Sequence, residues 1–342
     1  MKNKSVFVTG ASGFIASHCI IDLLKNNYRI VGTIRDVSRE KTLRSIISGA
    51  GLDNKQIEFK KADLREPDEI SSAIRGCDAV FHIASPVPII QPKNREDIIE
   101  TAKQGTLNVL KAARNNSVER VVLTSSVATL FDKTDNKSLY TPRDWANPEA
   151  KRTSPYSQSK ILAEQAAWKY GIEESINLTT IHPSLVLGPC LERDYGSSLE
   201  AIVKILNKEL PLIPNFGFEI VDVRDVARLH RLALEDDSSI GKRLIASTEF
   251  LWFSEIAANL KKKYPDRKIP TRAMPNWLAK LISLFIPELR EILLSLGRKV
   301  RFSNKESIRL GWQPMNIDKT IFDTAESLLK MEKKHEEDSS DS

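Results

Sequence analysis

The sequence predicts an α/β protein in which a doubly wound parallel sheet is followed by a smaller mixed domain. First, the short apolar strand Val6–Val8 leads directly into a glycine turn, and apolar residues then recur at helical spacing between Ile15 and Leu24. Second, apolar strands alternate with amphipathic helical patterns after this point, which is typical of a parallel sheet with crossover helices. Third, the alternation breaks down after Cys190, where prolines interrupt short segments.

The turn after the first strand predicts a binding site for the phosphates of a dinucleotide. Gly10 can adopt a positive φ, Gly13 has no Cβ to obstruct a pyrophosphate, and small Ala16 allows the helix to pack closely on the strand. The N-terminus of that helix then faces the anion. A tight structural turn is the alternative, but the strand before it and the helix after it favour a Rossmann-type site. The residues expected to contact the cofactor here are Gly10, Ser12, Gly13, Phe14 and Ile15.

These patterns divide the chain into two expected domains and a tail. A Rossmann domain occupies residues 1–189 and residues 220–247 return to it, a substrate-binding cap comprises residues 190–219 and 248–328, and residues 331–342 form a flexible acidic tail. Within the cap, the apolar stretch from Trp277 to Ile286 is expected to form a helix packed on the cap's own core. A lid over an apolar substrate and a surface for a partner are the alternatives for this stretch.

The residue after the second strand indicates which nicotinamide cofactor is used. This strand, Arg29 to Ile34, is followed by Arg35. An acidic residue at this place binds the ribose 2′-hydroxyl of NAD, whereas an arginine accommodates the 2′-phosphate of NADP. Arg35 therefore predicts NADPH as the cofactor. Arg39 and Lys41, in the next helix, add positive charge near that phosphate, although ordinary solvated helix charges explain them equally well.

Two further turns follow predicted strands, at the edge where a parallel sheet binds its ligand. After the third strand, Asp63 is expected to accept a hydrogen bond from the adenine amino group, with Leu64 against the ring; an acid at the N-terminus of a helix is the alternative for Asp63. After the fourth strand, Ala84 and Ser85 form a turn whose backbone can approach the nicotinamide half of the cofactor.

The fifth strand ends in three hydroxyl residues, the last of which is Ser126, and a helix opened by Tyr156 follows thirty residues later. Tyr156 and Lys160 are four residues apart and therefore share a face of that helix. A phenol has a pKa of about 10, but an adjacent ammonium and a nicotinamide cation lower that pKa. Tyr156 can then donate a proton to a carbonyl oxygen that Ser126 also binds, while Lys160 also holds the ribose hydroxyls.

Composition excludes several other classes of protein. The chain has 342 residues, a formal net charge of +6 and mixed charges along its helices, without the basic block typical of nucleic-acid binding. No apolar run has the length of a membrane span. Cys19, Cys77 and Cys190 have no paired spacing, which predicts free thiols in the cytoplasm and no metal site.

The chain resembles the extended short-chain dehydrogenase/reductases, within them the dihydroflavonol reductase and cinnamoyl-CoA reductase group, and especially its aldehyde and methylglyoxal reductases. The matching segments are Val8–Ile15, Ala62–Leu64, His82–Pro86, Val118–Ser126, Tyr156–Lys160 with Ala163–Trp168, Pro183–Pro189 and Asp222–Val226. The resemblance implies a catalytic triad of Ser126, Tyr156 and Lys160, and a 2′-phosphate site at Arg35 with Lys41 as a looser match. It also implies that Pro183, Ser184 and Val186 lie against the nicotinamide and the mouth of the substrate site.

We therefore expect an NADPH-dependent oxidoreductase that reduces a small-molecule aldehyde or ketone to an alcohol. Another extended-family enzyme, such as a nucleotide-sugar epimerase or a 3β-hydroxysteroid dehydrogenase, is one alternative. A non-catalytic dinucleotide-sensing protein is the other, although such proteins commonly lack the tyrosine–lysine pair. The sequence leaves open the carbonyl substrate, the physiological direction and the choice between monomer and homodimer.

Overall fold

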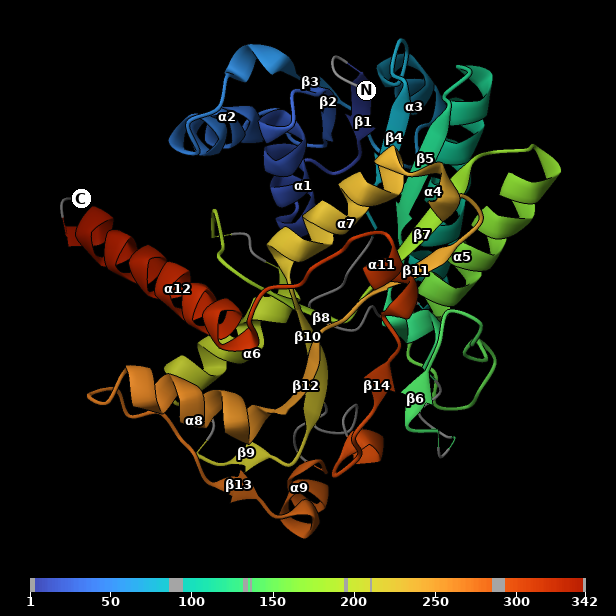
Figure 1. Ribbon diagram of the computed structural model, residues 1–342. Coiled ribbons are helices and arrows are strands. Elements are labelled where there is room, and N and C mark those ends of the chain that lie inside the picture. Colours follow the sequence, from blue (N-terminus) through green and yellow to red (C-terminus); the bar gives the residue numbers. More distant parts are fainter. Residues whose placement is uncertain are drawn as a thin grey trace.

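The computed structural model describes residues 4–85, 95–131, 135, 137–193, 196–209, 211–284 and 293–340. Within these residues the largest element is a seven-stranded sheet in the order β11-β7-β5-β4-β1-β2-β3, in which every pair is parallel (Figure 1). Its strands are β1 (Ser5–Val8), β2 (Arg29–Ile34), β3 (Ile57–Lys61), β4 (Ala79–His82), β5 (Arg120–Thr124), β7 (Leu178–Pro183) and β11 (Arg243–Ala246). The strand order reverses between β1 and β4, which is the point where such sheets bind ligands.

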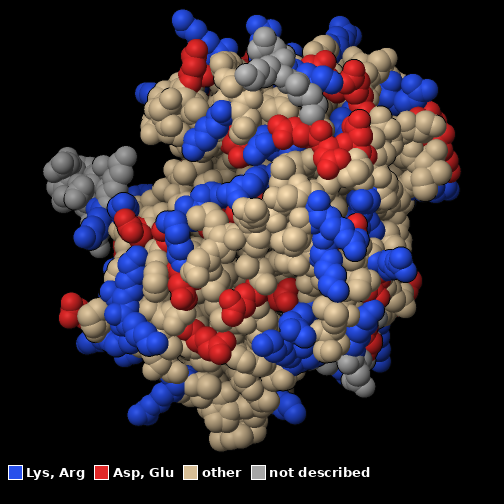
Figure 2. Space-filling model, viewed as in Figure 1, with Lys and Arg blue, Asp and Glu red and all other residues tan. Residues whose placement is uncertain are grey.

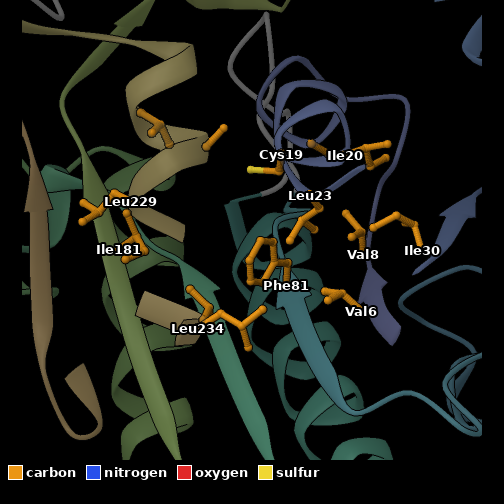
Figure 3. Close-up of a cluster of buried hydrophobic side chains, with 14 of the residues drawn as sticks. Val6, Val8, Cys19, Ile20, Leu23, Ile30, Phe81, Ile181, Leu229 and Leu234 are labelled. Carbon is orange, nitrogen blue, oxygen red and sulfur yellow. The ribbon is translucent and has the colours of Figure 1, made fainter. Parts of the chain in front are cut away.

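Helices cover both faces of this sheet, as the predicted fold requires. They are α1 (Phe14–Lys25), α2 (Arg39–Gly49), α3 (Pro67–Ala73), α4 (Arg95–Asn115), α5 (Pro155–Glu173) and α7 (Val223–Glu235). Apolar side chains of α1, α2 and α7 pack on one face, and those of α3, α4 and α5 pack on the other. In Figure 3, Leu23 of α1 lies beside Phe81 of β4, and Leu229 of α7 lies beside Ile181 of β7.

The first strand is buried on both faces because its side chains alternate between the two cores. Val6 and Val8 belong to the core under α1 and α7, whereas Phe7 belongs to the core under α4 and α5. All three side chains are fully buried. The run is continuously apolar because this strand lies inside a doubly wound sheet and is covered on both faces, as the sequence predicts.

The smaller part of the molecule contains short strands in sheets of two or three. They are β8 (Leu185–Leu187), β10 (Gly217–Asp222) and β12 (Glu249–Trp252) in one mixed sheet, β9 (Ile213–Pro214) with β13 (Ala273–Met274), and β6 (Leu139–Tyr140) with β14 (Arg301–Phe302). Its helices are α6 (Ser197–Leu206), α8 (Phe253–Lys263), α9 (Asn276–Ile282) and α12 (Ile317–Ser340). The short helix α11 (Lys305–Arg309) instead packs on β11, where the Ser307 hydroxyl donates to the Ile245 backbone oxygen at 2.7 Å. The short 3₁₀ helices of the chain are η1 (Asn54–Gln56), η2 (Val127–Thr129), η3 (Asp237–Ser239) and η4 (Leu293–Ser295). A separate core joins α6, α8 and α12.

The division between the two parts differs in detail from the expected domain boundaries. β10 ends at Asp222 and pairs with β8 and β12, so residues 220–222 belong to the smaller sheet and only α7 and β11 return to the large one. Conversely, Trp312 is fully buried against α7 and donates a hydrogen bond to the Asp225 backbone oxygen. A stretch assigned to the cap by sequence thus packs on the sheet half.

The chain after residue 331 is helical, whereas the sequence predicts a flexible tail from that point. The backbone of α12 continues to Ser340. The segment is rich in Glu and Lys, which have high helix propensity, and it extends a helix whose first turns are already packed on the smaller core.

The apolar stretch around α9 is exposed, which is the opposite of the packing that we expected. The exposed fractions of Trp277, Leu281 and Leu284 are 67%, 51% and 63%, whereas Ala279 is fully buried. The molecule's lower end, where Figure 1 places α9, is correspondingly uncharged in Figure 2, while positive and negative groups are interspersed over the rest of that face. The end of the predicted stretch, Phe285 and Ile286, lies outside the described residues.

Candidate active site

The glycine turn has the backbone geometry that the sequence predicts. Gly10 has a φ of +66°, and a Cβ at this position would lie 2.8 Å from the Cβ of Ala84. Gly13 begins helix α1 with extended backbone, and no described side chain caps the helix there. The N–H groups of the first turn are therefore available to an anion. Ser12, Phe14 and Ile15 follow the turn and are half-buried.

Thr9 fixes the distance between this turn and the end of β4. Its hydroxyl oxygen accepts hydrogen bonds from the backbone N–H groups of Ile83 and Ala84, both at 3.0 Å. The Thr9 hydroxyl donates to Nδ1 of His82 at 2.9 Å, so the proton of this neutral imidazole is on Nε2, which faces Thr106 Oγ1 at 3.3 Å. Burial lowers the pKa of His82 to about 3, which keeps the ring neutral. This chain of hydrogen bonds holds Ala84 and Ser85 beside Gly10.

The residues predicted for the adenosine end follow β2 and β3. Arg35 and Lys41 are exposed, and the Arg35 charge acts on the Asp63 carboxylate. Asp63 accepts hydrogen bonds from Nε and Nη2 of Arg65, at 3.0 and 2.7 Å, and this pairing holds the pKa of Asp63 at about 2. Its carboxylate thus already has a strong partner, and its expected contact with adenine stays a prediction.

Two neighbours complete the adenosine end. Leu64 packs against Gly105 of α4, where an added Cβ would be 3.0 Å from the Leu64 Cβ. Arg39 pairs with Glu192 at 2.6 Å, so this guanidinium reaches the segment after β8. Of the three basic residues considered for the 2′-phosphate, Arg39 is thereby the one with an acidic partner from the smaller part of the molecule.

The structure brings Ser126, Tyr156 and Lys160 together at the end of β5. Ser126 begins the short helix η2, and its hydroxyl accepts the N–H of Ala128 at 3.1 Å. Tyr156 lies in the first turn of α5, which Ser154 caps. Lys160 is buried one turn later, with its Nζ 3.5 Å from the backbone oxygen of Thr124. Burial lowers the pKa of Lys160 to about 8, although the Glu164 carboxylate opposes that effect.

The sequence led us to expect Lys160 and the nicotinamide cation to lower the pKa of Tyr156, but without the cofactor this pKa is raised. Burial raises the pKa of the phenol above its ordinary value, and a hydrogen bond with Ser126 acts in the opposite direction. The hydroxyl of Tyr156 therefore holds its proton at neutral pH. The protonated Tyr156 hydroxyl can therefore act as a proton donor.

The segment after β7 offers one unpaired polar group. The Ser184 N–H donates to the Ala246 oxygen at 3.0 Å, but among the described residues its buried hydroxyl has no hydrogen-bond partner. A buried hydroxyl without a partner costs free energy, so a polar ligand group is the natural partner. Pro183 ends β7 and is buried, and Val186 packs in the core with Val221, so the Val186 side chain contributes to packing.

Other groups of the site were not identified from the sequence. They are Thr9, Thr33, His82, Glu164 and Arg243. Glu164 had a signal, because it lies four residues after Lys160 and so on the same helix face. The others are identified only by contacts between strands. The described residues contain no cluster of metal-ligating side chains and no helix suited to cross a bilayer.

A parallel sheet, an uncapped helix after a glycine turn, and a Ser–Tyr–Lys cluster at the switch point define a nicotinamide-dinucleotide oxidoreductase. Residues 6–245 match the NAD dependent epimerase/dehydratase family, and the chain belongs to that family. Tetraketide alpha-pyrone reductase 1 of Arabidopsis thaliana is 39% identical over 273 residues, which cover 78% of this chain and 83% of that relative. Cinnamoyl-CoA reductase 1 of the same plant is 32% identical, covering 95% of this chain and 89% of the relative.

A solved structure extends the likeness to the whole architecture. The yeast methylglyoxal/isovaleraldehyde reductase Gre2 complexed with NADPH has a TM-score of 0.79 at 28% identity, and the match covers 96% of this chain and 99% of that one. The predicted fold class and the resemblance to the dihydroflavonol and cinnamoyl-CoA reductase group are therefore confirmed. The relatives are named as reductases, which supports an oxidoreductase over the non-catalytic alternative.

Proposed function

We propose that this protein uses NADPH to reduce the carbonyl of a small aldehyde or ketone to an alcohol. The observation that carries the proposal is the meeting of the Tyr156 and Ser126 hydroxyls beside the buried Lys160. Two hydroxyls at one point can bind a single carbonyl oxygen, and one of them is a protonated acid. The cofactor supplies a hydride when it is bound.

Each residue has a distinct role in this reaction. Tyr156 donates its proton to the carbonyl oxygen as negative charge develops there, and Ser126 donates a hydrogen bond to the same oxygen. The Lys160 ammonium stabilises the phenolate that Tyr156 becomes, and holds the ribose hydroxyls. The end of β4, held by Thr9, forms the floor of the nicotinamide site.

Arg35 supports NADPH as the cofactor in preference to NADH. Its guanidinium follows β2 at the sheet edge and is exposed to a ligand there. A guanidinium can donate two parallel hydrogen bonds to a 2′-phosphate, whereas NADH presents only a hydroxyl. The yeast reductase Gre2 complexed with NADPH has the same architecture at 28% identity.

The test is a turnover assay with a matched pair of variants. NADPH oxidation is followed with small aldehydes, α-dicarbonyls, aromatic ketones and dihydroflavonols, and we expect activity with at least one class. Tyr156→Phe should lower kcat by about 100-fold or more, the range of a lost general acid, with NADPH affinity retained. Ser126→Ala should lower it less.

Tyr170→Phe is the control, because Tyr170 lies on the same helix and packs against the α4 side of the core. It should retain wild-type turnover. Near wild-type turnover by Tyr156→Phe on the best substrate would contradict the assigned role. A protein that reduces none of the carbonyl classes would contradict the proposed function.

A further inference from the structure

A buried carboxylate lies one helical turn after Lys160. Glu164 of α5 is only 1% exposed. Its two oxygens accept hydrogen bonds from Arg243 Nε at 2.7 Å, His182 Nε2 at 2.8 Å, Ser125 Oγ at 2.6 Å, Trp168 Nε1 at 3.2 Å and Thr180 Oγ1 at 3.3 Å. Burial alone would raise the pKa of Glu164, but His182 and Arg243 hold it well below its usual range. Glu164 is therefore a fixed negative charge inside the protein.

Arg243 connects this charge to the turn that holds Ser126. Arg243 lies on β11, and its Nη2 donates a hydrogen bond to Thr129 Oγ1 at 3.1 Å. The N–H and the hydroxyl of Thr129 in turn donate to the Ser126 backbone oxygen, at 3.0 and 2.9 Å. Arg243 Nη1 donates to the backbone oxygens of Pro142 and Asp144 at 2.9 and 2.6 Å. The guanidinium also lies 3.7 Å from the centre of the Trp145 ring. The ion pair thus joins the helix of Tyr156 and Lys160 to the segment of Ser126.

Glu164 is also the acidic group that acts on Lys160. From β4, His82 faces the ammonium, but burial keeps that imidazole neutral. The neutral phenol of Tyr156 lies on the same helix, and the Lys160 ammonium donates a hydrogen bond to the Thr124 backbone oxygen at 3.5 Å. His182 of β7 and Arg243 of β11 both donate to Oε1 of Glu164. The carboxylate therefore has two basic partners and also raises the pKa of Lys160, which lies four residues earlier on the same helix.

We propose that Glu164 and Arg243 are positioning residues for carbonyl reduction, with Glu164 as the counter-ion of Lys160 and Arg243 as the clamp on the Ser126 turn. A buried ion pair that only specifies the fold is the alternative. The two differ in one respect, because a counter-ion changes the pH at which Lys160 titrates. This inference rests on the proposed function for its kinetic readout.

Glu164→Gln removes the charge and keeps the size of the side chain. Without the carboxylate, burial and the remaining Arg243 charge both disfavour the ammonium of Lys160. The alkaline limb of the kcat profile, which we expect near pH 8 in the wild type from the Lys160 pKa, should move to lower pH by about one unit. Glu173→Gln is the control, since Glu173 lies on the same helix with 57% of its side chain exposed, and it should leave the profile unchanged.

Arg243→Lys distinguishes the hydrogen bonds that Arg243 makes to the Ser126 turn from the effect of its positive charge. A lysine keeps the positive charge but cannot hold Thr129, Pro142 and Asp144 together with Glu164, because it lacks the fork of a guanidinium. We expect kcat to fall about tenfold while the alkaline limb and the NADPH affinity stay in place. If Glu164→Gln does not fold, Arg243→Gln takes its place, and the limb should then move to higher pH because the carboxylate acts on Lys160 without its partner.

NMR titration of protein labelled at its lysines, with the Lys160 signal assigned from Lys160→Gln, measures the same shift without turnover. A wild type that reduces no carbonyl would contradict the proposed function, and the titration would still test the counter-ion. A folded Glu164→Gln that binds NADPH and titrates at Lys160 like the wild type would overturn the inference. A wild-type alkaline limb in the substitute Arg243→Gln would overturn it equally.

Discussion

The two parts of the molecule are built by different means. In the sheet half, the predicted site residues follow the ends of parallel strands, and the inner strands are held by hydrogen bonds to neighbours on both sides, as β5 is by β4 and β7. In the smaller part, sheets have two or three strands, and packing depends on side chains such as the stacked rings of Phe216 and Phe253, 5.8 Å apart. The proposed chemistry therefore lies in the part where backbone hydrogen bonds fix positions most firmly.

The polar interior shows the same contrast. Buried polar side chains in the sheet half, such as Thr9, His82 and Glu164, make hydrogen bonds that reach from strand to strand or from helix to strand. In the smaller part, α9 leaves large apolar side chains in solvent. The two halves therefore differ most in what they leave exposed, since the apolar side chains of α9 face solvent in the smaller part. Four predictions can break or sharpen the comparison.

Acid should destabilise the sheet half most. Burial lowers the pKa values of His18, His82 and His230 to about 4, 3 and 4, from an ordinary value of 6.5. These rings stay neutral in the folded protein, while the unfolded chain takes up protons below pH 6.5, so stability is complete above that pH and falls as the pH drops towards 4. At pH 5 each ring should lower the free energy of unfolding by about 2 kcal/mol, and the three rings together by about 6 kcal/mol.

Urea unfolding at pH 7 and pH 5 measures this loss. Asp63, with a pKa of about 2, remains ionised at both values and does not contribute. Asp225, whose pKa burial raises to about 6, takes up a proton in the folded protein and offsets about 1 kcal/mol of the loss. His18→Gln removes one titrating ring and should reduce the difference by roughly a third. Equal unfolding free energies at the two pH values would contradict the prediction.

Arg35→Asp should reverse the cofactor preference without a change in the smaller part. We expect the wild type to bind NADPH at least about tenfold more tightly than NADH, because each charged hydrogen bond to the phosphate contributes about 1.5–3 kcal/mol. The aspartate repels the phosphate and accepts from the 2′-hydroxyl. Dissociation constants of NADPH and NADH, measured by fluorescence titration of the wild type and of Arg35→Asp, check this reversal. Similar weakening of both would instead assign the phosphate to Arg39 and Lys41, and equal wild-type affinities would refute the assignment.

Gly10→Ala tests the close approach of the two strand ends. The new methyl group would meet Ala84 at 2.8 Å in a backbone conformation that favours glycine, so we expect a loss of about 2–3 kcal/mol and weaker cofactor binding. Gly51→Ala is the control, because Gly51 has a similar φ of +72° with nothing within 4 Å of the added Cβ. It should lose about 1 kcal/mol from the backbone alone. Equal losses in the two variants would show that the approach to Ala84 is unimportant.

Leu281→Asp and Leu284→Asp should have the smallest effect on stability, within about 0.5 kcal/mol, because both side chains are more than half exposed. Thermal unfolding of each variant measures this. Unfolding of either protein would restore the expectation that this stretch is core. For the folded variants, a higher KM for apolar carbonyls with unchanged NADPH affinity would identify a lid, and an unchanged KM would exclude one.

Local sequence determined the sheet half and the residues of its site. The strand Arg29–Ile34 has the predicted bounds, because a buried strand imposes a period on neighbouring residues. The positive φ of Gly10 and the shared face of Tyr156 and Lys160 follow from spacing in the same way.

Only the tertiary structure decided the contacts between distant residues and the exposure of α9. Thr9 and His82 are 73 residues apart and Glu164 and Arg243 are 79 apart, and no local period relates such pairs. An apolar helical stripe has the same sequence whether or not another element covers it, so Trp277 and Leu281 did not reveal their exposure. The identities of the reacting groups are therefore local information, whereas their charge environment and their neighbours come from strand order and burial, which the whole chain determines.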